Sequence, residues 1–301
     1  MSNSDLIGTD ISGYLITKYI NSGSFGSVWE ATDKKGNKVA LKIPINTKEK
    51  NGQRWIIEEA RVYKVLNKNS REGISNMKVL KYTPDKSNSS VNVIVMDLLG
   101  DSLETVLKNN GKFRLKTVIL LAIQMLNVIK YIHECGYIHR DIKPDNFVMG
   151  VEDKKDVLYC IDFGLAKKYR DKHNDIIPFK DNLKFCGTAR YSSIASHIGH
   201  EQGRKDDLEA IGYNLIYLFK NNLPWRGIKN KNKDKRYKLI AECKNNTSEE
   251  ELCKGLPKEF EVYLKYVKNL DYNDTPLYRS LIKMFEKLYN KRGYNNETVF
   301  D

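Results

Sequence analysis

The chain has 301 residues, of which 41% are hydrophobic and 30% charged, and its formal net charge is +13. This length supports a sizeable core without metal or disulfide cross-links, and the composition excludes a disordered chain, a coiled coil and a fibre. No stretch reaches the roughly 18 uninterrupted apolar residues of a membrane span, so no membrane partner is expected. The five cysteines lack C-x-x-C spacing and the N-terminus lacks a secretory signal. We therefore expect a protein of the cytoplasm or the nucleus.

Strand patterns dominate the first third of the chain. Val39, Leu41 and Ile43 alternate with more polar or smaller residues, which is the period of a half-buried strand. The patterns predict three strands within 14–45, a helix over about 53–67, and two more strands at Met77–Thr83 and Val91–Leu98.

Helical spacing takes over after Gly100. Val118, Leu121, Met125 and Ile129 form one apolar stripe, and further helices are predicted near 205–220, 258–269 and 276–290. The chain is therefore expected to have an α+β fold with two lobes. The β-rich N-terminal lobe would cover about 14–97, and the larger helical C-terminal lobe would cover about 98–300.

The strongest chemical signal is the run Ile138–Asn146 (IHRDIKPDN), followed by Asp162-Phe163-Gly164. Together they resemble the catalytic loop and the metal-binding motif of protein kinases. Asp141 would orient a substrate hydroxyl and accept its proton, and Lys143 would steady the transferring phosphate. Asn146 and Asp162 would supply the hard oxygen ligands that suit Mg²⁺.

Upstream, the run Ile20–Val28 (INSGSFGSV) fits a glycine-rich phosphate loop, except that Asn21 stands at the first glycine position. Gly23 and Gly26 would let the backbone approach phosphate oxygens. Asparagine tolerates positive φ better than most residues, so we expect the loop to form. The residues of this run that we expect to bind ATP are Ile20, Asn21, Gly23, Ser24, Phe25, Gly26 and Val28.

The third predicted strand contributes a small residue and a cation to the same site. Strand alternation places Ala40 and Lys42 on one face, where Ala40 would lie beside the adenine ring and Lys42 near the phosphates. Lys42 needs an anionic partner from the following helix. Glu58 and Glu59 both qualify, and the helical register favours Glu59.

Over Tyr14–Phe300 the chain resembles the casein kinase 1 family of serine/threonine protein kinases. The stretches that carry the resemblance are Met96–Gly100, Ile161–Asp171, Gly187–Tyr191, Asp206–Glu209 and Leu223–Gly227. The resemblance implies one protein kinase domain over 14–300 that uses ATP and Mg²⁺. Ser193-Ile194-Ala195 departs from the Ser-Ile-Asn of that family, a difference that concerns local anchoring and not the chemistry.

The same resemblance implies roles for residues around the nucleotide. Met96 would be the gatekeeper, Asp97 and Leu99 would belong to the adenine hinge, and Val148 and Ile161 would form the floor of the adenine pocket.

In the catalytic loop, the resemblance implies that Thr188 bonds to Asp141 and Lys143, as in serine/threonine kinases. Asp207 would hold the backbone of the catalytic loop from its helix.

Positions Arg190, Gly227 and Arg236 correspond by resemblance to an anion pocket for acidic or phosphorylated protein substrates. The charge pattern supports this class of substrate independently. The segment Lys220–Lys238 has eight Lys or Arg residues against the single acid Asp234. Such a basic surface raises the local concentration of acidic substrates.

The stretch 165–186 contains no serine and no threonine. Kinases that are switched on by phosphorylation usually carry the modified residue in this segment. We therefore expect activity without activation-loop phosphorylation. Separately, we expect the protein to be a monomer.

Two alternatives remain open. A catalytically inactive scaffold with a kinase fold would have lost Lys42, Asp141 or Asp162, yet all three are present and only Asn21 is irregular. A nucleic-acid binder could use the basic segment, but only Tyr237 is interleaved with the cations near 229–238 and no nucleic-acid motif is present. Nucleic acid is not expected as a partner.

Overall fold

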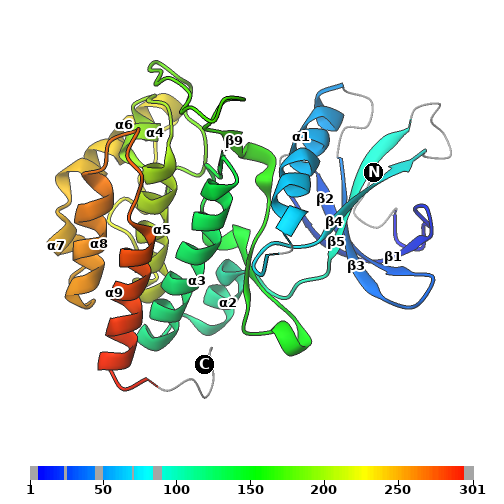
Figure 1. Cartoon of the computed structure of the whole chain (residues 1–301), viewed down its shortest axis with the longest axis horizontal. Coiled ribbons are helices and arrows are strands. Elements are labelled where there is room, and N and C mark those ends of the chain that lie inside the picture. Colours follow the sequence, from blue (N-terminus) through cyan, green and yellow to red (C-terminus); the bar gives the residue numbers. More distant parts are fainter. Residues whose placement is uncertain (1–5, 24–25, 45–49, 70, 84–89, 295–301) are drawn as a thin grey trace. The chain divides into compact units, whose positions relative to one another are not determined.

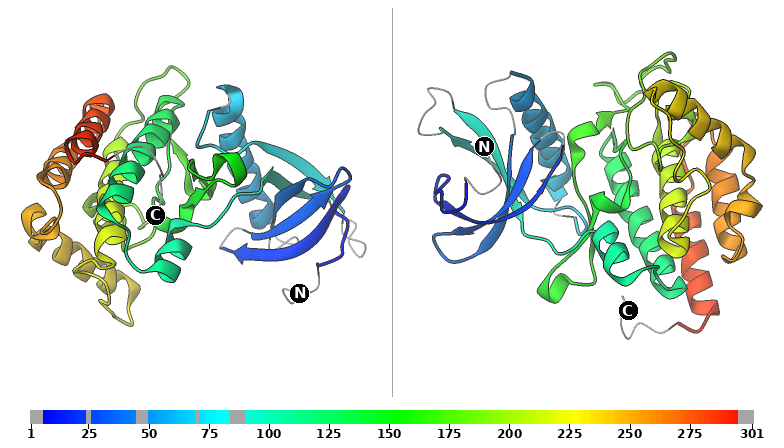
Figure 2. Two further views of the ribbon diagram at one scale, coloured as in Figure 1. Left: turned by 90° about the horizontal axis from the view of Figure 1, so that it is seen from below. Right: turned by 180° about the vertical axis from the view of Figure 1, so that it is seen from behind.

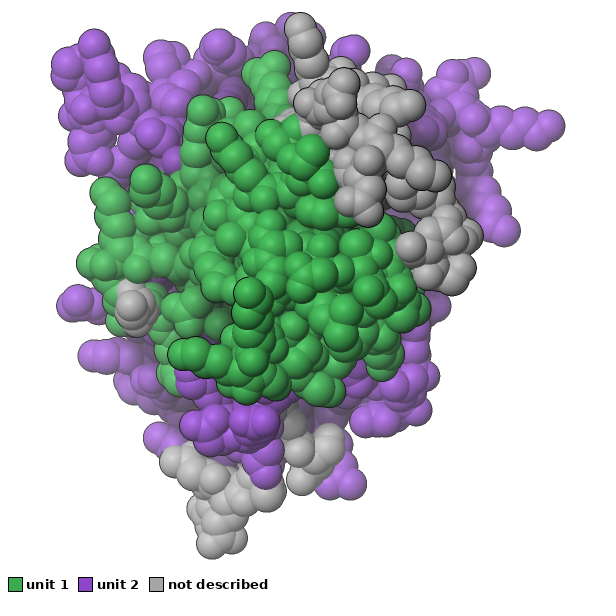
Figure 3. All heavy atoms as spheres, turned by 90° about the vertical axis from the view of Figure 1, so that its right-hand side faces the viewer, with its two compact units in different colours: residues 1–100, 161–164 green, residues 101–160, 165–301 purple. Residues whose placement is uncertain are grey.

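The structure is a computed structural model that describes residues 6–23, 26–44, 50–69, 71–83 and 90–294 (Figure 1). The chain divides into two compact units, which Figure 3 distinguishes by colour. Unit 1 contains residues 1–100 together with 161–164, and unit 2 contains residues 101–160 and 165–301. The short segment 161–164 therefore belongs with the N-terminal part of the chain.

Unit 1 is built on an antiparallel sheet of five strands in the order β1-β2-β3-β5-β4. The strands are β1 (Tyr14–Ser22), β2 (Ser27–Asp33), β3 (Lys38–Ile43), β4 (Met77–Tyr82) and β5 (Val91–Asp97). Leu41 and Ile43 enter the main apolar core on one face with Trp29 and Val93, whereas Ala40 and Lys42 alternate away from it. The predicted strands and their alternation are confirmed.

Helix α1 (Lys50–Leu66) packs on the sheet through a much smaller cluster (Figure 1). The buried side chains of this cluster are Ile56 and Ala60 of α1 and Ile94 of β5, and the partly buried Met77 and Met96 pack against them. The 3-10 helix η1 (Asn67–Asn69) follows α1. The predicted helix began at about residue 53, and the structure extends it by one turn at its N-terminal end.

Unit 2 is mainly helical, and α3 packs against α5 and α9 at its centre (Figure 2). The helices are α2 (Leu103–Asn110), α3 (Leu115–Glu134), α4 (Ile194–His197), α5 (Arg204–Lys220), α6 (Lys233–Asn246), α7 (Glu249–Leu252), α8 (Lys258–Lys268) and α9 (Tyr278–Lys291). Of the described helices, α3 alone is long and apolar enough to cross a membrane, but most of it is buried inside the unit. Core packing explains its composition.

Two short strand pairs position the loops of unit 2. Strand β6 (Tyr137–Ile138) pairs with β9 (Lys167–Lys168), and β7 (Phe147–Met149) pairs with β8 (Leu158–Cys160). Between β6 and β7 lies the run His139–Asn146, which ends in the 3-10 helix η2 (Pro144–Asn146). Because both of its ends are anchored in strands, this polar loop is held against the helical core.

Candidate active site

The glycine-rich run lies at the turn between β1 and β2. Its described residues close on each other, with the Gly23 N–H donating to the Gly26 carbonyl at 2.9 Å. A larger residue would clash at Gly26, because a Cβ there would lie 2.7 Å from the Ile43 carbonyl oxygen. Asn21 does not use the expected tolerance of positive φ: it stays in β1, pairs with Val28, and its Oδ1 accepts from the Ser22 N–H.

The other predicted ATP-binding residues of this run divide into two groups. Ser24 and Phe25 lie outside the described residues. Ile20 is exposed on β1 and Val28 is half-buried on β2, directly opposite Lys42 of β3.

Lys42 is the centre of a buried ionic cluster in unit 1. Its ammonium lies 2.7 and 2.8 Å from the two carboxylate oxygens of Glu59 and 2.8 Å from Oδ1 of Asp162. The Phe163 backbone N–H also bonds to Glu59. Glu58, the other candidate, is exposed and pairs with Arg61 on the outer surface of the helix. The register that favoured Glu59 is therefore the one that α1 adopts.

The charges of this cluster are set by competition between burial and attraction. Burial alone would lower the pKa of Lys42, but the carboxylates of Glu59 and Asp162 reverse this and raise its pKa well above the ordinary value. Lys42 is therefore a permanent cation. The Asp162 side chain is 29% exposed, compared with 8% for Lys42 and 1% for Glu59, so it is the member of the cluster that solvent reaches.

The backbone at Asp162 supports this geometry. Its φ of 63° lies in the left-handed region, which few residues other than glycine adopt. Tyr63 of α1 packs edge-on against Phe163 at 4.8 Å between ring centroids. The ion pair of Asp162 with Lys42 and the ring contact of Phe163 with Tyr63 thus hold a conformation that the free chain would disfavour.

The predicted hinge has a structural function that the sequence did not suggest. Ala40 lies opposite Met96, and Val39 opposite Asp97, in the β3–β5 register. The Asp97 carboxylate accepts from the backbone and side-chain amides of Asn76 at 2.8 and 2.9 Å, which ties the end of β5 to the start of β4. Leu99 and Ile161 are half-buried in unit 1.

In unit 2, three side chains converge on the carboxylate of Asp141. Thr188 Oγ1 donates to Oδ1 at 2.7 Å, and Lys143 Nζ lies 2.8 Å from Oδ2. Asn146 Nδ2 bonds to the Asp141 carbonyl oxygen at 2.9 Å and to Oδ2 at 3.3 Å. Val148 follows two residues later on β7 and is buried. The structure thus brings together four of the residues predicted from the sequence.

The backbone of this loop is fixed by Asp207 of α5. Its carboxylate accepts the N–H groups of His139 and Arg140 at 2.7 and 2.9 Å, and Nε2 of His133 lies 2.9 Å away. Burial would raise the pKa of Asp207, but the bonds from His133 and the loop lower it below the ordinary value. Arg140 has a φ of 68°, so the loop turns sharply before Asp141.

Close packing joins the loop to the segment that carries Thr188. Gly187 has a φ of 109°, and a Cβ there would lie 2.6 Å from the Arg140 carbonyl oxygen and 2.8 Å from Ser192 Oγ. Only glycine fits this position without displacing the loop. The geometry of the Thr188–Asp141 hydrogen bond therefore depends on the residue before it.

The predicted anion-pocket residues lie on neighbouring parts of unit 2. Arg190 stacks over the Tyr217 ring at 5.3 Å, and its carbonyl oxygen accepts from Trp225 Nε1 at 2.7 Å. Arg226 approaches the same ring at 5.9 Å. The next residue, Gly227, has a φ of 95°.

Arg236 lies on α6, which begins at Lys233, so the later part of the basic segment is helical. It donates from Nε to the Ile228 carbonyl oxygen, next to Gly227.

A buried lysine secures the segment around Arg190. Lys244 of α6 is only 1% exposed, and its ammonium bonds to the carbonyl oxygens of Ala189, at 3.0 Å, and Ser192. The rings of Tyr213 and Trp225 lie 4.9 and 5.1 Å from it. Burial lowers the pKa of Lys244 to about 7.

Candidate metal ligands occur in both units. The Nδ2 of Asn146 is engaged by Asp141, which leaves the amide oxygen as the atom for a cation, and the Asp162 carboxylate is open to solvent. Both are hard oxygen donors of the kind that Mg²⁺ selects, and this ion keeps water and phosphate oxygens in its remaining positions. Among the described residues, no group of three or more His, Cys, Asp or Glu side chains could hold a metal.

A family model for the protein kinase domain matches residues 14–291. The chain belongs to the protein kinase family. Protein kinases transfer a phosphoryl group from ATP with the help of Mg²⁺, so the chain is a phosphotransferase and the donor sets described above suit its cofactors. The α+β protein kinase fold expected from the sequence is confirmed.

Three parts of the kinase escaped sequence reasoning. Asp97 was expected in the adenine hinge and not as the acceptor for Asn76, and neither Arg226 nor Lys244 was given a role. Arg226 could have been found, because it adjoins Gly227 in the basic segment. Lys244 gave no signal, since its partners Ala189 and Ser192 lie more than 50 residues away in the sequence.

Proposed function

We propose that this kinase is a serine/threonine protein kinase of the casein kinase 1 type, which transfers the γ-phosphoryl group of ATP to acidic or pre-phosphorylated proteins. The observation that carries the proposal is the set of bonds around Asp141, where Thr188 and Lys143 hold opposite oxygens of one carboxylate. This threonine partner is the feature that the resemblance associates with serine and threonine as acceptors.

Asp141 acts as the group that orients the attacking hydroxyl. Thr188 fixes one carboxylate oxygen, and the other accepts the proton as the oxygen–phosphorus bond forms. Lys143 lies beside that second oxygen and neutralises charge on the transferring group. Asp207 keeps the loop backbone in place, which matters because displacement by about 1 Å can cost a hundredfold in rate.

Lys42 and Asp162 serve the nucleotide. Lys42 remains charged and is oriented by Glu59, so it neutralises phosphate oxygens without needing to change its protonation state. Asn146 and Asp162 would hold Mg²⁺, which shields the phosphate charge when it is bound. The rest of the nucleotide would be held by the glycine-rich turn and by the residues predicted for the adenine pocket, which are Ala40, Met96, Asp97, Leu99, Val148 and Ile161.

Preference for acidic or phosphorylated substrates rests on Arg190, Gly227 and Arg236. The Arg190 guanidinium lies over two tyrosine rings, so little side-chain entropy is lost when it binds an anion, and the Trp225 bond to its carbonyl oxygen fixes the backbone. Arg236 is exposed and offers a guanidinium fork to a phosphate. Arg226 is a further cation at this position.

We further propose that the kinase is a monomer of the cytoplasm or nucleus that needs no activation-loop phosphorylation. None of its five cysteines, all within the described residues, forms a disulfide, which supports a reducing compartment. Lys167 of the segment 165–186 forms an ion pair with Glu201 at 2.8 Å. This pair braces the segment without a phosphorylated residue.

The test uses labelled ATP with casein and with paired serine peptides that carry either phosphoserine or alanine before the target. Wild type should label casein and prefer the phosphorylated peptide, whereas Asp162→Asn should lose at least about a hundredfold in kcat. Arg190→Ala should raise KM for the phosphorylated peptide alone. Equal losses on both peptides would refute the anion pocket, and an inactive wild type would favour a scaffold.

A further inference from the structure

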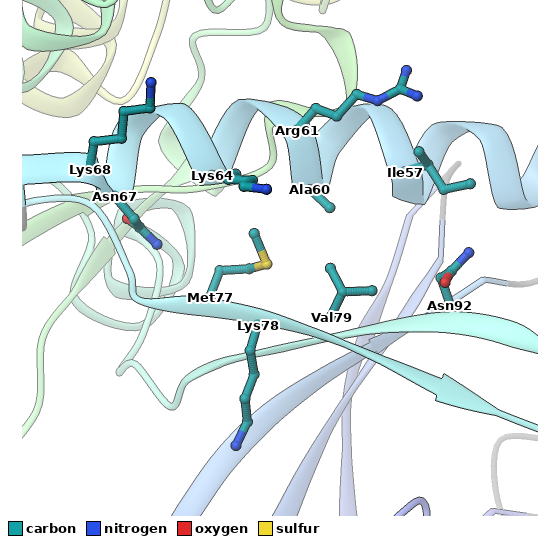
Figure 4. A pocket seen from close by; sticks show the side chains of 10 residues that line it. All are labelled: Ile57, Ala60, Arg61, Lys64, Asn67, Lys68, Met77, Lys78, Val79 and Asn92. Atoms are coloured by element: carbon teal, nitrogen blue, oxygen red, sulfur yellow. The ribbon is translucent and has the colours of Figure 1, made fainter.

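Two grooves on the described surface do not involve the catalytic loop, which is the run His139–Asn146. One of about 580 Å³ lies between α1 and β4 and is lined by residues such as Ala60 and Val79 (Figure 4). The other, of about 570 Å³, is lined by residues between Ser248 and Glu261 of unit 2. Because no residue of the loop lines either groove, its geometry is set from inside unit 2, where α5 packs against α3 and α8.

Helix α5 holds the catalytic loop at two positions on one face of the helix. Asp207 accepts the N–H groups of His139 and Arg140. Asn214 follows two helical turns later, so its side chain projects from the same face. Its Nδ2 donates to the carbonyl oxygen of Ile142 at 3.2 Å. The helix therefore binds donors at the start of the loop and an acceptor in its middle.

The Ile142 carbonyl belongs to the peptide group that joins Ile142 to Lys143. This group is planar, so a bond to its oxygen also restricts the direction of the Lys143 N–H and Cα. Lys143 Nζ lies 2.8 Å from Oδ2 of Asp141, on the carboxylate proposed to orient the attacking hydroxyl. The amide of Asn214 thus acts on the backbone between the two residues of this ion pair.

Asn214 is buried in a way that stability alone does not favour. The residue is 0% exposed, and Nδ2 also donates to the Ala210 carbonyl oxygen, one turn earlier, at 2.7 Å. Its Oδ1 is buried without a hydrogen-bond partner in the part of the chain that the structure describes. A buried amide oxygen without a partner costs stability, and an apolar side chain would avoid that cost. The bond from Nδ2 to the catalytic loop accounts for a polar residue at this position.

We propose that Asn214 is a positioning residue for phosphoryl transfer, which holds the Ile142–Lys143 peptide group in the orientation that places Lys143 beside Asp141. Since the side chain is fully buried, it acts through the backbone of the loop and not on a substrate. The inference rests on the functions proposed above for Asp141 and Lys143. It predicts an effect on kcat, because these residues act after both substrates are bound.

The test compares wild type, Asn214→Leu and Asn214→Val, using labelled ATP and a serine peptide that carries phosphoserine before the target. Both substitutions remove the donor but differ in size, so a loss that they share cannot come from overpacking by leucine. Each should lower kcat at least about fivefold while KM for ATP stays within about twofold of wild type. The urea midpoint should change little, because the lost bond to Ile142 is offset by removal of the unpaired Oδ1.

Asn127→Leu is the matched control. Asn127 lies on α3, and its Nδ2 donates to the Ile123 carbonyl oxygen one turn earlier, so the control removes the same kind of bond within a helix. Its kcat should equal that of wild type. The proposal is overturned if both Asn214 variants keep the wild-type kcat, or if Asn127→Leu shares their loss.

Hydrogen exchange tests the same point without catalysis. Loss of the Asn214 bond should speed exchange of backbone amides in peptides that span His139–Asn146, and Asn127→Leu should leave their exchange unchanged. Unchanged exchange of the loop in both Asn214 variants would also overturn the proposal. An inactive wild type would refute the proposed function instead, and the exchange measurement would then decide the role of Asn214.

Discussion

Lys244 donates a hydrogen bond to the carbonyl oxygen of Ala189 at 3.0 Å, from an almost wholly buried position on α6. The same ammonium bonds to the Ser192 carbonyl oxygen, so it secures the backbone on both sides of Arg190. Lys244 therefore links the packing of α6 to the segment of the proposed anion pocket.

Lys244→Met should reduce the free energy of unfolding by about 2–4 kcal/mol, because two buried carbonyl oxygens lose their donor. It should also raise KM for a phosphorylated peptide more than for an unphosphorylated one. Urea denaturation and steady-state kinetics measure the two effects. Lys238→Met, on the exposed side of α6, is the control for stability. A variant as stable as this control would contradict the assignment.

His197 should make the protein less stable in mild acid. Burial, together with the positive charge of Lys244, lowers its pKa from 6.5 to about 3. Below pH 6.5 the unfolded chain therefore binds a proton that the folded protein refuses, and stability should fall by about 1.4 kcal/mol for each pH unit toward pH 3.

The contribution of this residue can be isolated by denaturation at pH 6.5, 5.5 and 4.5. His133 also has a pKa lowered by burial, so wild type should show a slope with more than one source. His197→Gln retains a donor for the Ala189 carbonyl and should have a shallower slope. Identical slopes for the two proteins would show that His197 titrates normally in the fold.

Lys42→Met should abolish phosphoryl transfer and also destabilise the protein by about 3–5 kcal/mol, because Glu59 is left as an unpaired buried charge. Adding Glu59→Gln should restore part of the stability but none of the activity. Denaturation of the two single variants and the double variant forms a cycle that measures this coupling. Simple additivity of the two losses would argue against a buried pair.

The sequence predicted those features that depend on local pattern. Strand alternation placed Lys42 and Ala40 correctly, and the helical register distinguished Glu59 from Glu58. Features that depend on distant contacts could not be predicted in this way. Lys244 looks like any other lysine of a basic helix until α6 is packed against the segment of Ser192.

At two places the local backbone differs from what the sequence pattern suggests. Asparagine can adopt positive φ, but strand pairing with Val28 keeps Asn21 extended. The sequence patterns predict no helix between 220 and 258, yet Asn232 caps a helix through the Lys235 N–H and the chain becomes helical from Lys233. In both places hydrogen bonding of the folded chain decides the backbone and composition does not.

Asp207→Asn should lower kcat by about 10–100-fold with little change in KM for ATP, because an amide loses one of the acceptors that hold His139 and Arg140. Initial rates over a range of ATP concentrations separate the two constants. Asp234→Asn, an exposed change of the same kind, should be neutral. A raised KM for ATP with unchanged kcat would mean that Asp207 does not position the catalytic loop.

The most direct measurement is transfer of labelled phosphate from ATP to matched serine and tyrosine peptides by phosphatase-treated protein, compared with Asp141→Asn. Wild type should label the serine peptide without any prior phosphorylation, and Asp141→Asn should lose at least about a hundredfold while remaining folded. Transfer to tyrosine, dependence on prior phosphorylation, or full activity in the variant would contradict the proposed mechanism.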